Sequence, residues 1–382
     1  FKKCNFISAY AANTHQGCVR NYNEDRVSII LNITKPNSYK GTTWPKCSFF
    51  AVYDGHGGSG CADYLRDNLH QFIIKDANFP NSPKDAILKG CATAEEEFTK
   101  KHALNSSETD IIDRSGSCAV FALFIDDYCY IGNIGDSRAI ISKNEGKEIS
   151  SLTRDHKPND ELETKRIYSN GGRVYQTQTS AGLFGLNAFS GLNIHNFSST
   201  KFNNNQMLSG PSRVFPGRLS VSRTFGDVEA KLIKFGGLPH VLTAIPDIFS
   251  FKIEDNIDFI VLGCDGIYDL FKNEELSNAV YMSMPEKKDM SIHSFCGRAV
   301  DMIMKTALSR NSLDNITTVL ISFNNLEQTL KNYIEKEKII DDNLQTIKEN
   351  NIQNKTNSNF NNIGNTNNTN NTNNTNNTNI MK

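Results

Sequence analysis

The sequence predicts an α+β fold built from layers of strands and helices. Two observations predict it. Strand patterns occur in consecutive runs along the chain, and helical patterns fall between only some of these runs. Strict alternation of strands and helices would instead indicate a doubly wound parallel sheet. A single globular unit from residue 9 to residue 323 is therefore expected.

The strands are predicted from short runs rich in β-branched and aromatic residues. They are Arg26–Ile33, Phe49–Tyr53, Ser117–Asp126, Tyr128–Asn133, Arg138–Lys143, Phe249–Ile253, Phe259–Leu262 and Thr317–Phe323. The helices are predicted from apolar residues at helical spacing. They are Gly60–Lys75, Pro83–His102, Asp160–Asn170, Asn273–Met282 and Ser291–Ser309.

The chain divides into three predicted parts. Residues 1–324 form the main domain, in which 173–217 is a polar, Gly/Ser/Asn-rich insertion without a structural pattern. Residues 325–350 are expected to form an amphipathic helix, because apolar residues recur there at near-helical spacing. Residues 351–382 are rich in Asn and Thr and have no apolar periodicity, so this tail is predicted to be disordered.

Composition argues against several classes of protein. Lys and Arg total 41 and Asp and Glu total 42, and no basic block occurs, so binding to nucleic acid is not expected. The longest apolar run, Cys118–Ile125, is far shorter than the roughly 20 residues of a membrane span. Nine cysteines are scattered singly, which indicates a reducing compartment, the cytoplasm or the nucleus.

Acidic residues stand at the ends of several predicted strands. Asp54 and Asp265 each end an apolar run, Asp314 leads into the last strand, and Glu24 and Asp25 precede the first. Each alone fits an ordinary turn. Together, carboxylates that converge at one edge of a sheet would repel one another unless a cation compensates them. Ligation by oxygen alone suits Mg²⁺ or Mn²⁺ rather than zinc.

A rival interpretation uses the same segment. Gly55, Gly57 and Gly60 match the spacing G-x-G-x-x-G of dinucleotide-binding turns. Asp54 would then place a negative charge against the pyrophosphate, and Asp76 lies at a helix end rather than a strand end. We therefore favour the alternative that the glycines let the backbone, including the Gly55 carbonyl, approach a bound ion.

Two further residues fit a metal site that acts on phosphate. Arg20 lies four residues before Glu24, and arginine suits bidentate binding of phosphate. His56 lies two residues after Asp54, where it is a candidate general acid. Neither a Cys-x5-Arg loop nor a G-x-S-x-G turn occurs, so the sequence indicates no covalent nucleophile.

The combination resembles the metal-dependent protein phosphatase 2C family of serine/threonine phosphatases. Nine blocks carry the resemblance, in order from about Ser8 to Asn324. They are 20–26 (RNYNEDR), 52–58 (VYDGHGG), 115–119 (SGSCA), 132–138 (GNIGDSR), 152–158 (LTRDHKP), 166–172 (RI with GG), 218–227 (RLSVSRTFGD), 264–269 (CDGIYD) and 314–318 (DNITT).

This resemblance implies an α-β-β-α sandwich of two mainly antiparallel sheets flanked by helices. It implies a binuclear centre in which Asp54 bridges two cations and Gly55 ligates one through its carbonyl. Asp265 and Asp314 match ligands of the second cation. The other matching acids are Glu24 and Asp25, which would hold metal-bound waters, and Asp155 and Asp269, which are linked to a weaker third cation.

The resemblance also implies the activity. Hydroxide activated by the two cations, Mg²⁺ or Mn²⁺, would hydrolyse phosphoserine and phosphothreonine in proteins. Arg20 matches the phosphate-binding arginine, and His56 matches the proposed general acid. The expected partners are phosphorylated proteins, and a monomer is expected. A catalytically inactive scaffold of the same fold is the alternative, and it would show substitutions among the acids. The insertion at 173–217 falls where the family has a short flap.

Overall fold

The computed structural model describes residues 6–104, 113–180, 207–285 and 290–366. The chain splits into two compact units. The first comprises Phe1–Met284 together with Ser291–Thr329, and the second comprises Pro285–Met290 together with Leu330–Lys382. The first unit holds both sheets and every residue of the predicted site.

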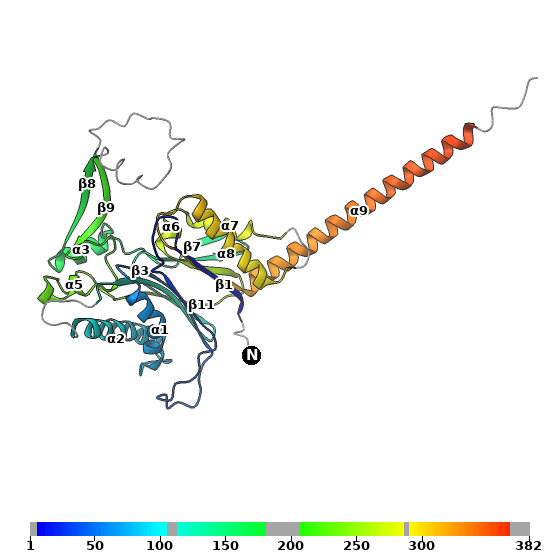
Figure 1. The fold of residues 1–382 in the computed structure, drawn as a ribbon. Helices are drawn as coiled ribbons and strands as arrows, with labels where there is room; N and C mark the ends of the chain where they lie inside the picture. The colour runs from blue at the N-terminus through cyan, green and yellow to red at the C-terminus, as the bar shows by residue number, and fades with distance from the viewer. Residues whose placement is uncertain (1–5, 105–112, 181–206, 286–289, 367–382) are drawn as a thin grey trace, which may run out of the picture. The chain divides into compact units, whose positions relative to one another are not determined.

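Two antiparallel sheets form the centre of the first unit (Figure 1). The first sheet has the strand order β1 (Ile7–His15), β13 (Ile316–Phe323), β12 (Ile257–Gly263), β6 (Arg138–Lys143) and β7 (Glu148–Ser151). The second has the order β11 (Asp247–Lys252), β5 (Tyr128–Ile134), β4 (Gly116–Ile125), β3 (Cys47–His56) and β2 (Arg26–Ile30), and β10 (Phe225–Gly226) also pairs with β4. All paired neighbours in both sheets are antiparallel.

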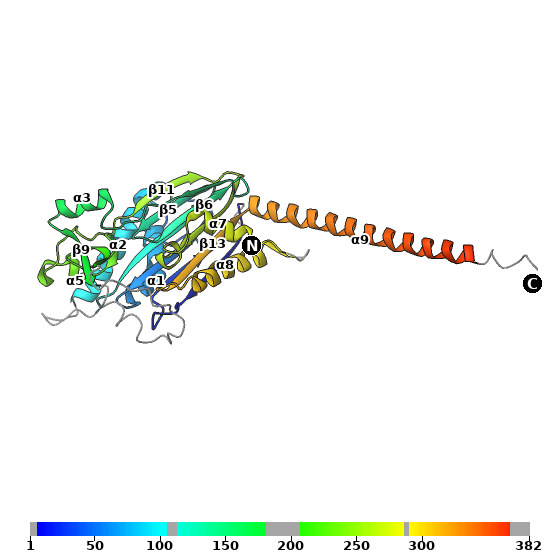
Figure 2. The same ribbon diagram turned by 90° about the horizontal axis from the view of Figure 1, so that it is seen from above.

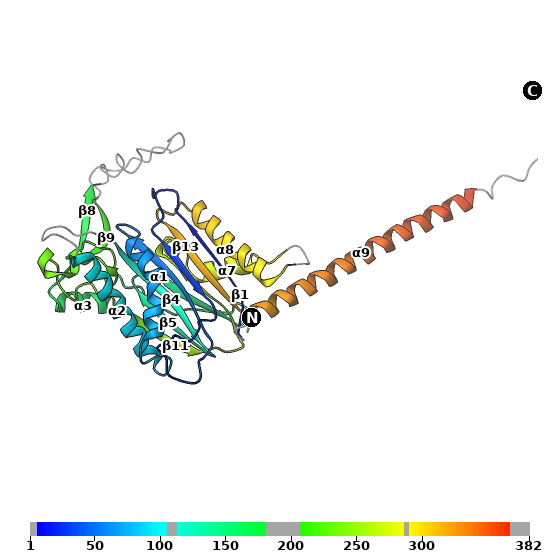
Figure 3. The same cartoon turned by 60° about the horizontal axis from the view of Figure 1, so that its bottom comes forward.

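Helices cover the outer face of each sheet (Figure 3). On the second sheet they are α1 (Gly60–Lys75) and α2 (Pro83–Leu104), and on the first sheet α7 (Asn273–Tyr281) and α8 (Ile292–Ser309). The shorter helices are α3 (Glu161–Ser169), α5 (Val228–Lys231), η1 (Ile233–Phe235) and α6 (Asp265–Tyr268). The predicted α-β-β-α sandwich is therefore confirmed.

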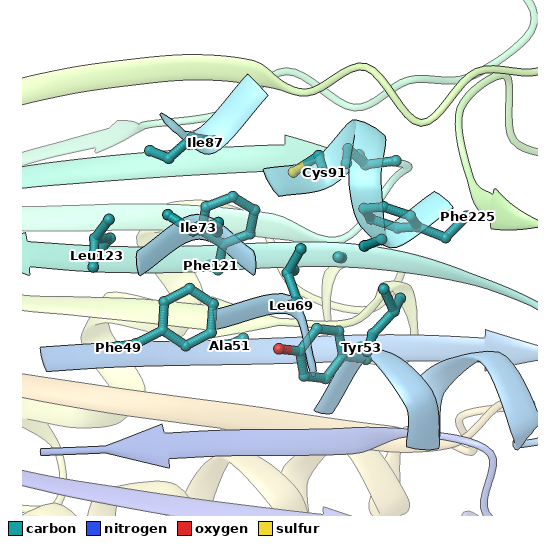
Figure 4. Close-up of a cluster of buried hydrophobic side chains, with 14 of the residues drawn as sticks. Phe49, Ala51, Tyr53, Leu69, Ile73, Ile87, Cys91, Phe121, Leu123 and Phe225 are labelled. Carbon is teal, nitrogen blue, oxygen red and sulfur yellow. The ribbon is translucent and has the colours of Figure 1, made fainter. Parts of the chain in front are cut away.

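Strand β3 shows how the core positions the site. Side chains alternate between the two faces of a strand. Phe49 lies in the cluster beneath α1 and α2, where its ring stacks 5.5 Å from that of Phe121 (Figure 4). Phe50 and Val52 lie in the other cluster, between the two sheets. Asp54 continues the second series, so the strand carries its carboxylate into the space between the sheets.

The antiparallel pairing of β3 with β4 excludes the rival dinucleotide-binding interpretation. That interpretation requires a strand, a helix and a second strand parallel to the first. Here the helix after the glycines, α1, is followed by α2, and the next strand runs antiparallel to β3. The glycine-rich turn therefore serves the site at the end of β3.

The insertion contains more structure than the sequence indicates. Residues 173–217 begin and end in β8 (Arg173–Ser180) and β9 (Met207–Phe215), which pair as an antiparallel hairpin. The hairpin projects from the end of the sandwich near α3 and α5 (Figures 1 and 2). Its strands pair only with each other among the described strands, and their sequences lack a clear apolar alternation. Residues 181–206 lie outside the described residues.

The C-terminal region also differs from expectation. Helix α9 (Asn324–Thr366) covers the predicted amphipathic segment but continues to Thr366, into the tail that we predicted to be disordered from residue 351. Extending an existing helix costs much less than nucleating one, which accounts for the continuation into polar sequence. The rest of the tail, 367–382, lies outside the described residues. Among the helices that the structure describes, none combines the length and apolarity needed to cross a membrane.

Candidate metal and phosphate site

Three carboxylates converge at one edge of the sandwich. Asp54 lies near the end of β3, Asp136 in the turn between β5 and β6, and Asp265 at the start of α6 directly after β12. Each offers an oxygen atom, and these atoms lie within 4.8 Å of one another. The strands that deliver them belong to both sheets, so the sandwich itself brings the three acids together.

Burial and mutual repulsion disfavour the charged forms of these acids. Burial raises the pKa of Asp54 and of Asp265 well above the usual range, and the neighbouring carboxylates raise it further. Burial likewise raises the pKa of Asp136 to about 6. A cluster of buried acids with this chemistry is compensated by a divalent cation that prefers oxygen ligands. The donor set therefore fits Mg²⁺ or Mn²⁺.

Glu24 and Asp25 lie beside this cluster and are both buried. A Glu24 carboxylate oxygen accepts a hydrogen bond of 2.5 Å from the Gly58 backbone, and the Glu24 backbone donates to Asn315 at 2.8 Å. Among the described residues, neither carboxylate oxygen of Asp25 makes a hydrogen bond of ordinary geometry. Burial raises the pKa of Asp25 to about 6, although Thr317 and Cys264 lie near enough to act against this rise. Unpaired buried oxygens are costly, so they point to a ligand such as ordered water or a cation.

Gly55 has no room for a side chain. A Cβ atom there would lie 2.5 Å from the Glu24 carbonyl oxygen. The strand end must therefore pass directly against the segment that carries Glu24 and Asp25. This close approach is the structural reason for glycine beside Asp54 and explains how the two acidic segments share one site.

Asp314 and Arg20 form an ion pair at the site. The Arg20 guanidinium donates to the Asp314 carboxylate at 2.6 Å, and the other Asp314 oxygen accepts from the Asn315 backbone at 2.7 Å. Burial alone would lower the pKa of Arg20. The negative charges of Asp314 and Glu24 have the larger effect, so the pKa of Arg20 is raised. The Arg20 side chain stays 48% exposed. A guanidinium carries five N–H donors, so donors remain beyond the contact with Asp314, and the binding of phosphate by Arg20 stays a prediction.

His56 is held by Asp227, a residue that the sequence analysis did not single out. The His56 Nε2 atom lies 2.8 Å from a carboxylate oxygen of Asp227, which also accepts from the Thr224 hydroxyl at 2.9 Å. Burial opposes protonation of the ring, but the charge and hydrogen bond of Asp227 raise the pKa of His56. A protonated ring at neutral pH is the state that a general acid requires.

Asp155 and Asp269 are not among the three clustered acids, but both lie near enough to raise the pKa of Asp136. Arg138 donates two hydrogen bonds to Asp155, at 2.6 and 3.0 Å. The Asp269 side chain is 64% exposed and lies 3.5 Å from the ammonium group of Lys157, which is also 3.8 Å from Asp136. Basic side chains thus accompany both acids that the resemblance links to a third cation, and the third cation stays a prediction.

An ion network lies beneath the hairpin. Glu163 on α3 is buried and accepts hydrogen bonds from Arg223 at 2.7 Å and from Arg166 at 2.8 Å. Burial alone would raise the pKa of Glu163, but these arginines hold it far below its usual range. The two arginines also donate to backbone carbonyls of Val241 and Ile245. Glu163 therefore ties α3 to the segments that follow the hairpin.

Replacing Glu163 with glutamine is expected to lower the free energy of unfolding by about 3 kcal/mol at pH 7, because the buried guanidinium of Arg223 and the partly buried one of Arg166 both lose the charge of this buried carboxylate. A depressed pKa contributes stability above the ordinary Glu pKa of about 4.3, and this contribution falls as the pH drops below that value. Urea unfolding at pH 7 and pH 3.5 should therefore show a smaller difference from wild type at the lower pH.

The matched control is Glu96→Gln on α2. Glu96 is 64% exposed and pairs with Lys100 one helical turn away. Such a surface pair contributes less than about 0.5 kcal/mol. Equal losses for the Glu96 and Glu163 variants, or a Glu163 loss that does not change with pH, would contradict the structural role of the network.

Comparison with known proteins shows which proteins this chain is similar to. The family model described as protein phosphatase 2C matches residues 14–316. Protein phosphatase 1A of Bos taurus is 29% identical over 310 residues, which cover 80% of this chain and 69% of that protein. A probable protein phosphatase 2C of Caenorhabditis elegans is 32% identical over 281 residues, which cover 72% of this chain and 66% of that protein. The match therefore spans about two thirds of the length of these relatives.

Solved structures support the fold. The crystal structure of serine-threonine phosphatase 2C from Toxoplasma gondii has a TM-score of 0.58 at 22% identity, covering 82% of this chain and 94% of that chain. The structure of a C. elegans sex-determining protein has a TM-score of 0.61 at 22% identity, covering 86% of this chain and 67% of that chain.

Proposed function

The chain belongs to the protein phosphatase 2C family of serine/threonine phosphatases, and from this premise we propose that it hydrolyses phosphoserine and phosphothreonine in proteins at a centre that holds two divalent cations. The observation that carries the proposal is the convergence of Asp54, Asp136 and Asp265 within 4.8 Å, next to an arginine and a histidine suited to phosphate chemistry.

The acids of this chain would hold the cations. Asp54, Asp136 and Asp265 would supply carboxylates, and Asp314 and the Gly55 carbonyl would supply further oxygens. When bound, Mg²⁺ or Mn²⁺ would supply positive charge that lowers the pKa of water and neutralises phosphate oxygens. The unpaired carboxylate of Asp25 would accept hydrogen bonds from water held at the site.

Arg20 and His56 would act on the phosphate group itself. The exposed donors of Arg20 would bind phosphate oxygens and stabilise the charge that they carry in the transition state. His56, held by Asp227, would donate its proton from the ring to the departing serine or threonine oxygen. The carboxylate of Asp227 would keep the His56 ring oriented through its hydrogen bond and would favour the charged form of the ring through its negative charge.

The proposal is tested by phosphate release from a phosphoserine peptide. We expect no turnover in the presence of a chelator, and recovery when Mn²⁺ or Mg²⁺ is added in excess. Binding of the ion should also raise the melting temperature, because a ligand that binds only the folded state stabilises it. Turnover that persists under chelation would contradict the metal requirement. Metal binding without turnover would instead favour the inactive scaffold.

A further inference from the structure

A cavity of about 700 Å³ opens beside His56 and is not used by the chemistry described above. One wall is formed by the loop 215–219 that follows β9. The other is formed by α5 and by Phe235 and Gly236, and Arg114 borders the cavity as well. All of these lining residues belong to the described part of the first unit. The cavity therefore joins the base of the hairpin to the proposed general acid.

The position of His56 indicates which part of the substrate could bind in the cavity. In an in-line displacement the leaving oxygen departs on the side opposite the nucleophile. His56 would protonate this oxygen, so the polypeptide attached to it must lie on the His56 side of the site. This step rests on the proposed function. The cavity lies on that side, since His56 and Gly57 both line it.

The cavity wall carries one uncompensated positive charge. Arg114 pairs with Glu229, and Asp227 is already bound to His56. The exposed side chain of Arg218 forms no ion pair with any residue that the structure describes. A phosphopeptide with an anionic side chain near the phosphorylated residue would supply the missing partner.

The backbone of Arg218 is fixed in an uncommon conformation. Its φ angle is +60°, in the left-handed region that is unfavourable for a residue with a side chain. Its N–H donates to Val214 at 2.8 Å, and its carbonyl accepts from Arg213 at 2.7 Å. Residues in such conformations concentrate at ligand-binding positions, where the surrounding structure holds them. The backbone thus presents the side chain of Arg218 at a set place on the wall.

Apolar surface accompanies this charge. Phe215 lines the cavity with 49% of its surface exposed, and Leu219 and Phe235 line it as well. We propose that the cavity binds the substrate polypeptide next to the phosphorylated residue, and that Arg218 selects segments with an anionic side chain close to it. That side chain is a carboxylate or a second phosphate, and both have the same charge-assisted chemistry toward arginine.

The test uses phosphoserine peptides that differ at one position, scanned from three residues before to three residues after the phosphoserine. The position holds glutamate, glutamine, lysine or a second phosphoserine. At the best position we expect wild-type kcat/KM to be about fivefold higher for the glutamate peptide than for the glutamine peptide, the effect of an exposed ion pair of about 1 kcal/mol. The preference should shrink at high salt. A larger gain with phosphoserine identifies a second phosphate as the preferred anion.

Arg218→Asn removes the charge, and asparagine tolerates the left-handed conformation. This variant should lose the preference, and Arg218→Glu should favour a lysine peptide. Each result is the ratio of the kcat/KM values of two peptides for the same variant. A general loss of activity lowers both values equally and leaves this ratio unchanged. The control is Arg298→Asn, at an exposed arginine on α8, which should keep the wild-type ratio.

Two different failures are distinguishable. If the wild-type protein releases no phosphate from any peptide or from nitrophenyl phosphate, the proposed function is wrong. If it hydrolyses all peptides at equal rates, or if Arg218→Glu keeps the preference for glutamate, only the role of the cavity is overturned.

Discussion

Asp54→Ala is expected to reduce phosphate release from a phosphoserine peptide by at least about a thousandfold at every Mn²⁺ concentration. Asp54 belongs to the acid cluster, and its carboxylate is the one that the family resemblance implies as a ligand of both cations. Loss of the cations removes several kcal/mol of transition-state stabilisation, and about 4 kcal/mol corresponds to this factor. Steady-state assays with Mn²⁺ titrated into the variant give the measurement.

A second readout separates loss of metal from loss of fold. The acids of the cluster repel one another without a cation, so removing one relieves repulsion in the metal-free protein. The variant Asp54→Asn, which keeps the shape of the side chain, should melt at the same temperature as metal-free wild type or higher. It should also lose the rise in melting temperature that Mn²⁺ causes in wild type.

Asp85→Ala is the matched control, because Asp85 is exposed on α2, away from the cluster. It should keep wild-type turnover and the full response to Mn²⁺. If Asp54→Ala retained wild-type turnover with Mn²⁺, the two-cation proposal would be wrong. A large fall in the melting temperature of Asp54→Asn would instead assign Asp54 a structural role.

The sequence alone was sufficient to predict where the acids next to a buried strand lie. Asp54 and Asp265 follow apolar runs whose burial could be predicted, and Asp314 precedes one, so their position at an edge of the sheets followed from strand geometry. The pairing of β12 with β13 places the strand ends next to Asp265 and Asp314 side by side, and β3 packs against both strands across the sandwich. The cluster of three acids includes Asp54 and Asp265, whereas Asp314 is paired with Arg20.

Asp136 and Asp227 show what sequence reasoning missed. Each follows a glycine in a short turn, and a Gly-Asp pair is an ordinary turn signal. A useful signal for Asp136 was its place directly after the apolar strand Tyr128–Asn133, the same pattern that marked Asp54. Nothing local marks Asp227. It reaches His56 because β10 pairs with β4 next to β3, a contact between segments more than a hundred residues apart.

Strand β1 and the hairpin were missed for a different reason. The residues of β1 include several alanines, which have low strand propensity, and its second half is exposed. It forms because β13 offers an unpaired edge, and the two strands pair over their full length. In the same way, β8 and β9 pair with each other rather than with a core sheet. Backbone pairing of this kind leaves little apolar pattern in a sequence.

His56→Gln is expected to reduce turnover of a phosphoserine peptide by about a hundredfold or more, within the usual range for a lost general acid. Turnover of nitrophenyl phosphate should fall by less than about tenfold, because its leaving group is stable without a proton. The measurement is kcat for both substrates under saturating Mn²⁺. Equal losses on the two substrates would remove the general-acid role.

The variant Asp227→Asn tests the role of Asp227, the hydrogen-bond partner of the proposed general acid His56. The substitution keeps a hydrogen-bond partner for the His56 ring but removes the negative charge that favours the protonated ring. Loss of that charge should lower the pKa of His56, so the decline of peptide turnover on the alkaline side should begin at a lower pH. Nitrophenyl phosphate turnover should not show this shift, since it needs little protonation. A shift of the same size for both substrates would place the titrating group elsewhere, in the binding of metal or phosphate.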